Sequence, residues 1–90
     1  MLYRIYIGAN NKTGKVETKK IIKLTSESFE GFTLYEGVKG YWKGKAENSV
    51  ILEIETRKKM RLKAMVGVLV KELKQEAVGL AEVGKMRFIN

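Results

Sequence analysis

The side chains in this sequence that could do chemistry belong to a narrow set of residue types. The 90 residues include no histidine, aspartate or cysteine, which leaves glutamate, lysine, tyrosine and the hydroxyl residues. Histidine is the commonest general base and metal ligand, and zinc sites are built mainly from histidine and cysteine. We therefore expect no enzymatic activity, no metal site and no cofactor, because no nucleophile and base stand at a useful spacing.

The only tryptophan, Trp42, follows Tyr41 in a stretch punctuated by lysines and glycines. Exposed aromatic side chains beside cations stack on bases or anchor protein partners. The alternative is that Trp42 folds over a neighbouring element and closes the core. The candidate binding residues in this stretch and upstream are Asn11, Lys12, Lys15, Lys19, Lys20, Lys39, Tyr41, Trp42, Lys43 and Lys45.

A second group of cations follows residue 56, at the start of a predicted helix. Such clusters are common in nucleic-acid-binding patches. The alternative is a solvated helix start whose cations pair with Glu53 and Glu55. This second basic patch comprises Arg57, Lys58, Lys59, Arg61 and Lys63.

The formal net charge is +8, with 44% hydrophobic and 31% charged residues. A basic domain of this kind attracts polyanions and associates quickly with acidic partners, although lysines also serve only to keep a protein soluble. The absence of cysteine fits a reducing compartment, and no apolar run approaches the ~18 residues of a membrane span. No secretory signal is recognisable. We predict a cytoplasmic protein without a membrane partner.

The loop from Gly8 to Lys15 is similar to a phosphate-binding P-loop but differs in two respects. Five residues separate Gly8 from Gly14, where the motif has four, and Val16 replaces the Ser or Thr that holds magnesium. A triphosphatase loop is therefore not expected. The remaining interpretations are a looser nest of backbone donors for a phosphate and a plain loop.

Residues 5–10 resemble the RNP2 strand of RNA-recognition motifs, in which an aromatic on the open sheet face stacks on a base. The companion RNP1 is poorly matched, because the residues after Tyr41 depart from its pattern and belong to a hairpin tip. The alternative for Tyr6 is a partly covered sheet residue in a subunit contact.

Hydrophobic periodicity predicts helices and strands along the whole chain. The segment after the first loop is ambiguous: Thr18 to Glu27 reads as a helix with Thr18 as N-cap and Gly31 as its left-handed stop, and 16–24 reads as a returning strand. We favour the helix, because the apolar residues there do not alternate. The predicted elements are a strand at 2–7, a helix at 18–27, hairpin arms at 32–36 and 49–56 around a tip at 37–45, a helix at 58–75, a strand at 77–83 and a short strand or tail at 86–89.

The second predicted helix has the clearest pattern, with Leu62, Met65, Leu69 and Leu73 at three- and four-residue steps. Gly67 interrupts this helix, at a cost of about 1 kcal/mol relative to alanine. We expect a compensating close approach to the sheet or to the other helix.

The order of elements predicts one α+β domain over residues 1–90, a ferredoxin-like βαββαβ sandwich with two helices on one face of a four-stranded antiparallel sheet. The first loop, the hairpin tip and the end of the second helix then lie at one end. Lysines at a helix start oppose its dipole, which anion capture would explain for Lys19 and Lys20. The lysine-rich pole so formed comprises Lys12, Lys15, Lys19, Lys20, Lys39, Lys43, Lys45, Lys71 and Lys74.

Four segments, at residues 6–10, 32–37, 47–49 and 75–78, occur in an order that resembles small uncharacterised proteins of phages and their bacterial hosts. This resemblance has no assigned activity to carry over. It implies an accessory binding protein in preference to a metabolic enzyme.

From these features we predict a non-enzymatic binding module for an anionic partner, nucleic acid or a nucleotide, that uses the lysine-rich pole and Trp42. Two alternatives stay open: a phage-type accessory protein that binds and inhibits or adapts an acidic host protein, and a homo-oligomer that sequesters a small anionic ligand. A homodimer is expected in any case, because the hairpin's outer edge and the 86–89 tail are unprotected strand edges.

Overall fold

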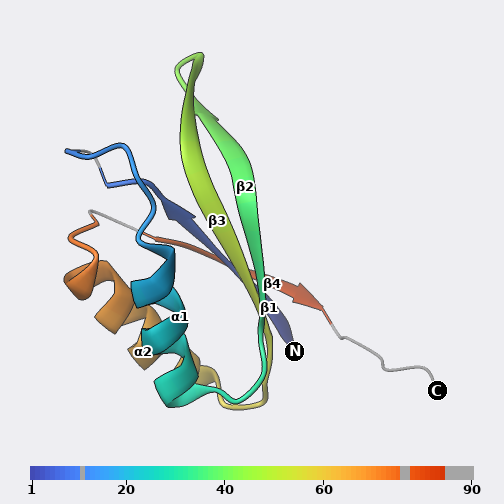
Figure 1. Ribbon diagram of the computed structural model, residues 1–90. Coiled ribbons are helices and arrows are strands. Elements are labelled where there is room, and N and C mark those ends of the chain that lie inside the picture. The colour runs from blue at the N-terminus through green and yellow to red at the C-terminus, as the bar shows by residue number, and fades with distance from the viewer. Residues whose placement is uncertain (11, 76–77, 85–90) are drawn as a thin grey trace.

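The chain is described here from a computed structural model that covers residues 1–10, 12–75 and 78–84, with Trp42 described by its backbone. Two helices pack on one face of a single sheet (Figure 1). The order of elements matches the predicted one. The elements are β1 (Leu2–Gly8), α1 (Thr18–Ser28), β2 (Thr33–Trp42), β3 (Lys45–Glu55), α2 (Lys59–Glu72) and β4 (Gly79–Gly84).

The four strands form one antiparallel sheet in the order β2-β3-β1-β4. This arrangement confirms the predicted ferredoxin-like fold. In the central pair, Leu2 lies opposite Glu55 and Gly8 lies opposite Ser49. The two central strands, β1 and β3, are therefore far apart in the sequence, and residues from both meet at every position of the sheet that the helices cover.

Alternation along the strands sends one set of side chains to the helices and the other to the opposite surface, which we call the open face. Ile5, Leu52 and Ile54 are fully buried on the helix side. Burial of a side chain of this size stabilises the fold by about 1.5–3 kcal/mol. The core consists of Tyr3, Ile5, Ile7, Ile21, Val50, Leu52, Ile54, Leu62, Met65, Leu69 and Leu73.

Residues 18–28 form a helix, as favoured over the strand, but neither predicted end is right. The N-cap residue is Glu17 and it makes no side-chain capping bond, so Thr18 is the first helical residue. At the other end Phe29 is already extended, and its N–H donates to the Thr25 carbonyl at 2.9 Å. Gly31 does not have a positive φ, so it is not the left-handed stop.

The hairpin is longer than the sequence predicts, and it projects beyond the rest of the sheet (Figure 1). Its turn consists only of Lys43 and Gly44, with φ of 51° and 78°. Positive φ at both positions suits the right-handed twist of a two-residue hairpin. The predicted tip at 37–45 is wrong because Gly37, with φ of 67°, lies at a register shift within β2 and does not end the strand.

Gly67 of α2 is exposed, and a Cβ added to it would meet no atom within 4 Å. The predicted close approach at Gly67 is therefore wrong. The predicted strand or tail at 86–89 lies outside the described residues. No helix within the described ranges is long and apolar enough to cross a membrane.

Candidate ligand-binding site at the base of the hairpin

The loop between β1 and α1 is organised around Asn10. Its Oδ1 accepts hydrogen bonds from the backbone N–H groups of Lys12 at 2.8 Å and Thr13 at 3.3 Å. The Asn10 carbonyl accepts a third from Gly14 at 2.8 Å, and the Thr13 hydroxyl accepts one from Lys15 at 3.2 Å. These four donors are engaged within the loop, which favours the plain-loop interpretation over a phosphate nest.

This loop packs against the hairpin through Asn48. The Asn48 amide donates to the Gly14 carbonyl at 3.3 Å, and its oxygen accepts a hydrogen bond from the Lys39 ammonium at 2.5 Å. Lys39 and the first loop are therefore neighbours, although 24 residues or more separate them in the sequence. Together they surround a hollow of about 270 Å³, lined by Ala9, Asn10, Gly14, Lys39, Ala46, Glu47 and Asn48.

A larger hollow of about 480 Å³ lies beside the first one and shares Lys39 and Glu47 with it. Two glycines make room for it: a Cβ on Gly8 would lie 2.5 Å from Glu47 Oε1, and a Cβ on Gly40 would lie 3.1 Å from Ser49 Oγ. The Gln75 amide donates to the Gly8 carbonyl at 3.1 Å, which ties the segment after α2 to this hollow. Its lining is Tyr6, Ile7, Gly8, Val38, Lys39, Gly40, Glu47, Ser49, Ile51 and Gln75.

A charged network lies further along the open face. Glu53 is only 8% exposed, and its carboxylate accepts hydrogen bonds from Arg4 Nε and, at 2.8 Å, from the Tyr35 hydroxyl. The bond from Arg4, followed by that from Tyr35, holds the pKa of Glu53 below its ordinary value. The same carboxylate raises the pKa of Arg4 and of Tyr35. The network is therefore a fully paired charge cluster.

The hollow above this network, of about 350 Å³, shares three lining residues with the 480 Å³ hollow, namely Tyr6, Val38 and Ile51. Tyr6 is 44% exposed and Tyr35 is 45% exposed. The open face thus carries one continuous depression with apolar and aromatic walls. Polar groups stand at both of its ends.

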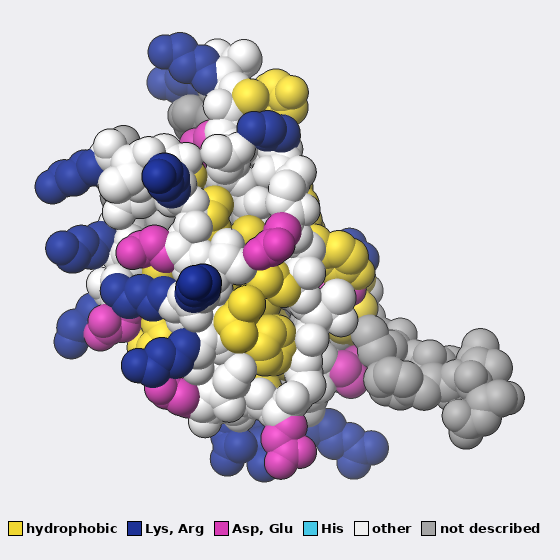
Figure 2. Space-filling model, viewed as in Figure 1, with side chains coloured by type: hydrophobic (Ala, Val, Ile, Leu, Met, Phe, Trp, Pro, Cys, Tyr) yellow, Lys and Arg dark blue, Asp and Glu magenta, His cyan; other side chains and the backbone are white. Residues whose placement is uncertain are grey.

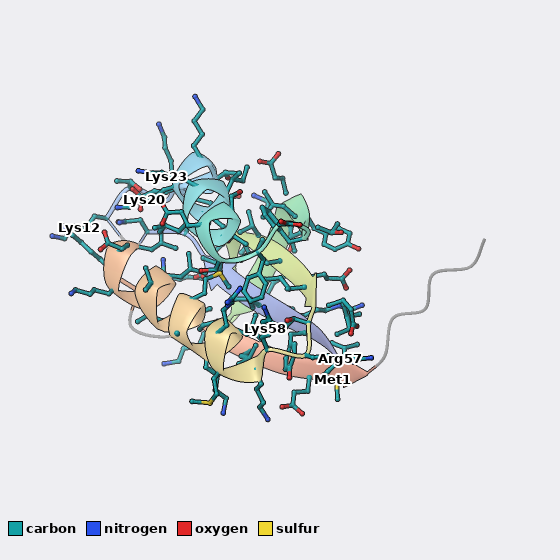
Figure 3. The ribbon with its side chains drawn as sticks, turned by 90° about the horizontal axis from the view of Figure 1, so that it is seen from below. Met1, Lys12, Lys20, Lys23, Arg57 and Lys58 are labelled. Atoms are coloured by element: carbon teal, nitrogen blue, oxygen red, sulfur yellow. The ribbon has the colours of Figure 1, made fainter. Side chains whose placement is uncertain are left out.

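The structure gives one lysine of the predicted lysine-rich pole a structural role. Lys20 donates through Nζ to the carbonyl of Glu72, the last residue of α2, at 2.9 Å. A cation at a helix C-terminus stabilises that helix, so stability accounts for Lys20 and the predicted need for anion capture there is wrong. Lys20 lies on the helix side together with Lys12 and Lys23 (Figure 3). The exposed lysines of this region also include Lys15, Lys19, Lys71 and Lys74.

The tip of the hairpin forms a separate group. Lys43 is four residues beyond Lys39, or about 13 Å along an extended strand. Tyr41 is 72% exposed, and the backbone of Trp42 pairs with that of Lys45 across the turn. Of the predicted binding residues, only Lys39 lines the two hollows at the hairpin base. Asn11 and the Trp42 side chain lie outside the described part of the chain.

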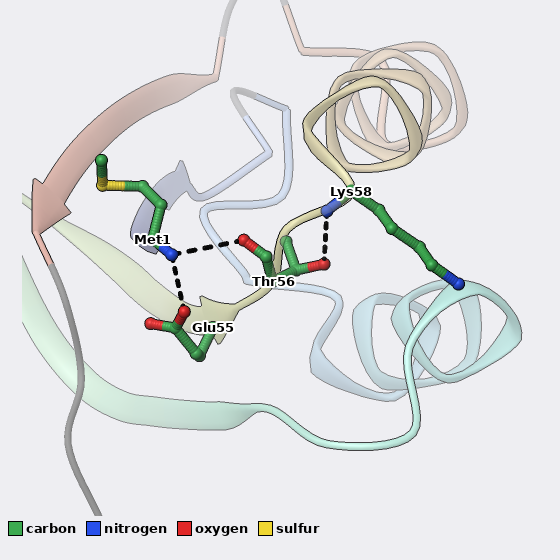
Figure 4. Close-up of polar contacts among 4 residues, drawn as sticks. All are labelled: Met1, Glu55, Thr56 and Lys58. Atoms are coloured by element: carbon green, nitrogen blue, oxygen red, sulfur yellow. Dashed lines mark hydrogen bonds and ion pairs between the residues drawn. The ribbon is translucent and has the colours of Figure 1, made fainter.

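The second basic patch begins at a tightly bonded junction between β3 and α2 (Figure 4). The Thr56 hydroxyl accepts a hydrogen bond from the Lys58 N–H at 3.0 Å, and the Thr56 N–H donates to the Met1 carbonyl at 3.1 Å. The Met1 amino group contacts Glu55 Oε1 at 2.6 Å. The N-terminus of the chain therefore helps to fix where the patch starts.

Lys59 of the patch forms an ion pair with the sheet, between its Nζ and Glu82 of β4 at 2.6 Å. This contact raises the pKa of Lys59 and lowers that of Glu82. The predicted pairing of these cations with Glu53 is wrong, because Glu53 is bonded to Arg4 and Tyr35, and Glu55 contacts the Met1 amino group. The exposed members of the patch are Arg57, Lys58, Lys59, Arg61 and Lys63.

Sequence reasoning missed Arg4, Tyr35 and Gln75 and assigned Glu53 only to an outward strand position. The available signal was that Arg4 and Glu53 both occupy open-face positions in alternating strands. Their pairing, however, depends on the register that sets them directly opposite each other. Within the described ranges no three acidic side chains gather closely enough to hold a metal ion.

Comparison with known proteins gives the fold and no family. No protein-family model matches the chain, and no curated protein matches it. Among solved structures, it is similar to CPII, a nitrogen regulatory PII-like protein from Thiomonas intermedia K12 bound to ADP, AMP and bicarbonate (TM-score 0.62, 10% identity, 98% of this chain and 96% of that one). It is also similar to the periplasmic divalent cation tolerance protein CutA from Archaeoglobus fulgidus (TM-score 0.60, 16% identity, 99% of this chain and 88% of that one).

These findings contradict the predicted function, a module that binds its anionic partner through the lysine-rich pole and Trp42. The two solved structures named above, which match the chain over nearly its whole length, are a nitrogen regulatory protein and a cation tolerance protein, and neither is described with a nucleic acid. The structure adds a physical reason, because the hairpin carries its turn, with Lys43, beyond the rest of the sheet and away from the lysines of the first loop, α1 and α2 (Figure 1). The phage-type host-protein adaptor likewise has no support.

Proposed function

We propose that this chain is a non-catalytic, self-associating protein that binds a small phosphate-bearing ligand of the adenosine phosphate class at the base of its hairpin. The observation that carries the proposal is the pair of adjoining hollows, of about 270 and 480 Å³, that share Lys39 and Glu47. Small-molecule sites have volumes of about 300–1,000 Å³. The fold similarity to a PII-like protein bound to ADP, AMP and bicarbonate supports this choice of ligand.

The residues around these hollows offer complementary contacts for such a ligand. The Lys39 ammonium, positioned by Asn48, is a charged donor for a phosphate. The exposed ring of Tyr6 offers a stacking surface for a base, and stacking of this kind is worth about 1–3 kcal/mol. Gly8 and Gly40 have no side chains that would fill the space in the larger hollow.

The other similar structure raises the question of a cationic ligand. The net charge of +8 opposes cation binding, and the described residues include no cluster of three carboxylates. Both features favour an anionic ligand over a cationic one.

Self-association through the open face follows from what that face exposes. Tyr6 and Tyr35 are each nearly half exposed, and Val38 and Ile51 lie between them in the continuous depression, so a ligand stacked on Tyr6 would be enclosed between the associated subunits. Covering such a surface is favourable by about 25 cal/mol for each Å² of apolar area. Covering the face removes little water from Glu53, because its side chain is already only 8% exposed and its carboxylate is bonded to Arg4 and Tyr35.

The ligand is tested by thermal unfolding and calorimetry with ADP, AMP, ATP and bicarbonate, with a single-stranded oligonucleotide for comparison. A nucleotide at 100 times its Kd stabilises the folded state by about 2.7 kcal/mol. Lys39→Met should weaken nucleotide binding about ten-fold, as expected for loss of a charge-assisted hydrogen bond. Lys43→Met, at the exposed turn, is the matched control and should bind normally. No stabilisation by any of the four ligands, or equal loss in both variants, contradicts the proposal.

Sedimentation velocity over a range of concentrations tests self-association. We expect a species larger than a monomer, which Ile51→Glu should dissociate because it places a charge in the covered face. Ile22→Glu, on the exposed side of α1, is the control and should leave the assembly intact. A monomer at every concentration would rule out this part of the proposal.

A further inference from the structure

The net charge of the chain is concentrated on one side of the molecule. We define the helix layer as residues 17–28 and 57–74, which include α1, α2 and their first flanking residues. It contains ten lysines and arginines against three glutamates, which leaves +7 of the total charge of +8. The remaining eight cations and seven glutamates nearly cancel. The strong basic character of this protein is therefore a property of the helix layer.

Most cations of the helix layer do not stabilise the fold through a contact with the described residues. Within the layer, Lys20 bonds to the carbonyl end of α2 and Lys59 pairs with Glu82, whereas the side chains of the other cations make no hydrogen bond or ion pair with the described residues. Figure 2 shows many lysine and arginine side chains on the helix side of the molecule, with acidic side chains among them. Figure 3 shows Lys20 and Lys23 at one end of the layer and Arg57 and Lys58 at the other. The exposed cations are Lys19, Lys23, Arg57, Lys58, Lys59, Arg61, Lys63, Lys71 and Lys74.

Apolar side chains lie among these cations on the outside of the helices. Met60 is 78% exposed, Val68 is 45% exposed and Ile22 is 41% exposed. Ala64 and Gly67 are exposed as well, with Ala64 four residues after Met60 and Gly67 three residues after Ala64. Because Ala64 and Gly67 are small, the aliphatic parts of the neighbouring lysines and the Met60 side chain extend furthest from this surface.

We propose that the helix layer binds the surface of an anionic lipid bilayer. The combination of dispersed cations with exposed apolar side chains fits a charged headgroup layer above hydrocarbon, into which lysine stems and Met60 can extend. The surface is formed by two exposed helices, and the hollows described above lie by the open face and the hairpin. A planar partner suits such a surface better than a protein that inserts a side chain into a pocket. The layer also stays accessible when the open face is covered.

This inference revises the prediction of no membrane partner, and it concerns attachment to a surface without insertion of a helix across it. It does not depend on the proposed nucleotide site, because none of the residues that line the two hollows belongs to the helix layer. A failure of either proposal is therefore distinguishable from a failure of the other.

Co-sedimentation with phosphatidylcholine vesicles, with and without phosphatidylglycerol, tests the proposal with the full chain. Binding should require phosphatidylglycerol and weaken as salt shortens the range of the attraction. The double variant Lys23→Glu/Arg61→Glu should reduce binding at least ten-fold, because each charge near the surface contributes on the order of 1 kcal/mol. Lys43→Glu/Lys45→Glu changes the net charge equally at the hairpin turn and should bind nearly as well as the unmodified chain.

The apolar contribution is tested separately with Met60→Gln, which should lower vesicle binding about three-fold and leave binding to soluble polyglutamate unchanged. Circular dichroism confirms that each variant is folded. Three results overturn the proposal: no binding to phosphatidylglycerol vesicles at low salt, equal loss of binding in the two double variants, or binding to polyglutamate without binding to vesicles. The last result would identify an acidic protein as the partner.

Discussion

The two faces of this molecule use charge in opposite ways. On the open face, Glu53 is 8% exposed and both of its oxygens accept hydrogen bonds, from Arg4 and from Tyr35. On the helix layer, most cations are exposed and only a few are engaged in the fold. A charged residue therefore stabilises the fold where the sheet register places a partner next to it. Where the register places no partner next to it, the charged residue remains available for binding.

The largest expected difference between the faces concerns two neighbours in β3. Leu52 is fully buried under the helices, whereas Ile51 is partly exposed on the open face. Leu52→Ala should lower the free energy of unfolding by about 3 kcal/mol, because it leaves a cavity in the core. Ile51→Ala should cost about 1 kcal/mol or less in the monomer. Urea unfolding at low protein concentration measures both, and equal losses would show that the open face is as well packed as the core.

Glu53 should make the stability of the fold depend on pH. Its pKa is lowered from 4.5 in the folded state, so its contribution is present above about pH 4.5 and is lost as pH falls through the lower, folded-state value. Glu53→Gln should therefore lower the unfolding temperature by several degrees at pH 7 and have little effect near pH 3. Thermal unfolding between pH 3 and pH 7 measures this difference.

Glu82→Gln is the control from the helix side, since Glu82 forms an exposed ion pair with Lys59. An exposed pair contributes little to stability. This variant should therefore show a much smaller difference across the same pH range. A difference for Glu53→Gln that does not change with pH would mean that packing, and not charge, explains the role of Glu53.

A smaller change is expected inside the helix layer. Thr25 is fully buried, and its hydroxyl has no hydrogen-bond partner among the described residues. Thr25→Val replaces the hydroxyl with a methyl group of similar shape and should stabilise the fold by about 1 kcal/mol. Thr18→Val, at the partly exposed start of α1, should give no such gain. Chemical unfolding compares the two, and destabilisation by Thr25→Val would indicate that the hydroxyl has a partner after all.

The smallest predicted effects compare two glycines. Gly67 lies on the outer side of α2, where an added methyl group would meet no neighbouring atom, so Gly67→Ala should stabilise the helix by up to about 1 kcal/mol. Gly44 has a φ of 78°, so Gly44→Ala should destabilise the hairpin by about 1 kcal/mol. Thermal unfolding of both variants measures these opposite signs. A loss for Gly67→Ala would mean that the outside of α2 is already covered.

Several features of this protein are determined by local pattern and could be predicted from the sequence. The alternation around Leu52 and the three- and four-residue steps from Leu62 to Leu73 define a strand and a helix, whose order then indicates the ferredoxin-like fold. The ends of the strands and helices were harder to predict from the sequence. Gly37 is a typical turn residue, yet it occupies a register shift within β2, because pairing with β3 continues beyond it.

The candidate site depended on contacts between segments that are distant in the sequence. Lys39 meets the first loop only through Asn48, and Glu53 meets Arg4 only because β1 pairs with β3 in one register. Lys20 shows the same limit, since its role at the end of α2 depends on how the two helices pack. Composition alone determined that the protein is basic. Only the tertiary structure decided which of its charges are paired within the fold and which remain on one outer surface, because pairing requires a partner within a few ångströms.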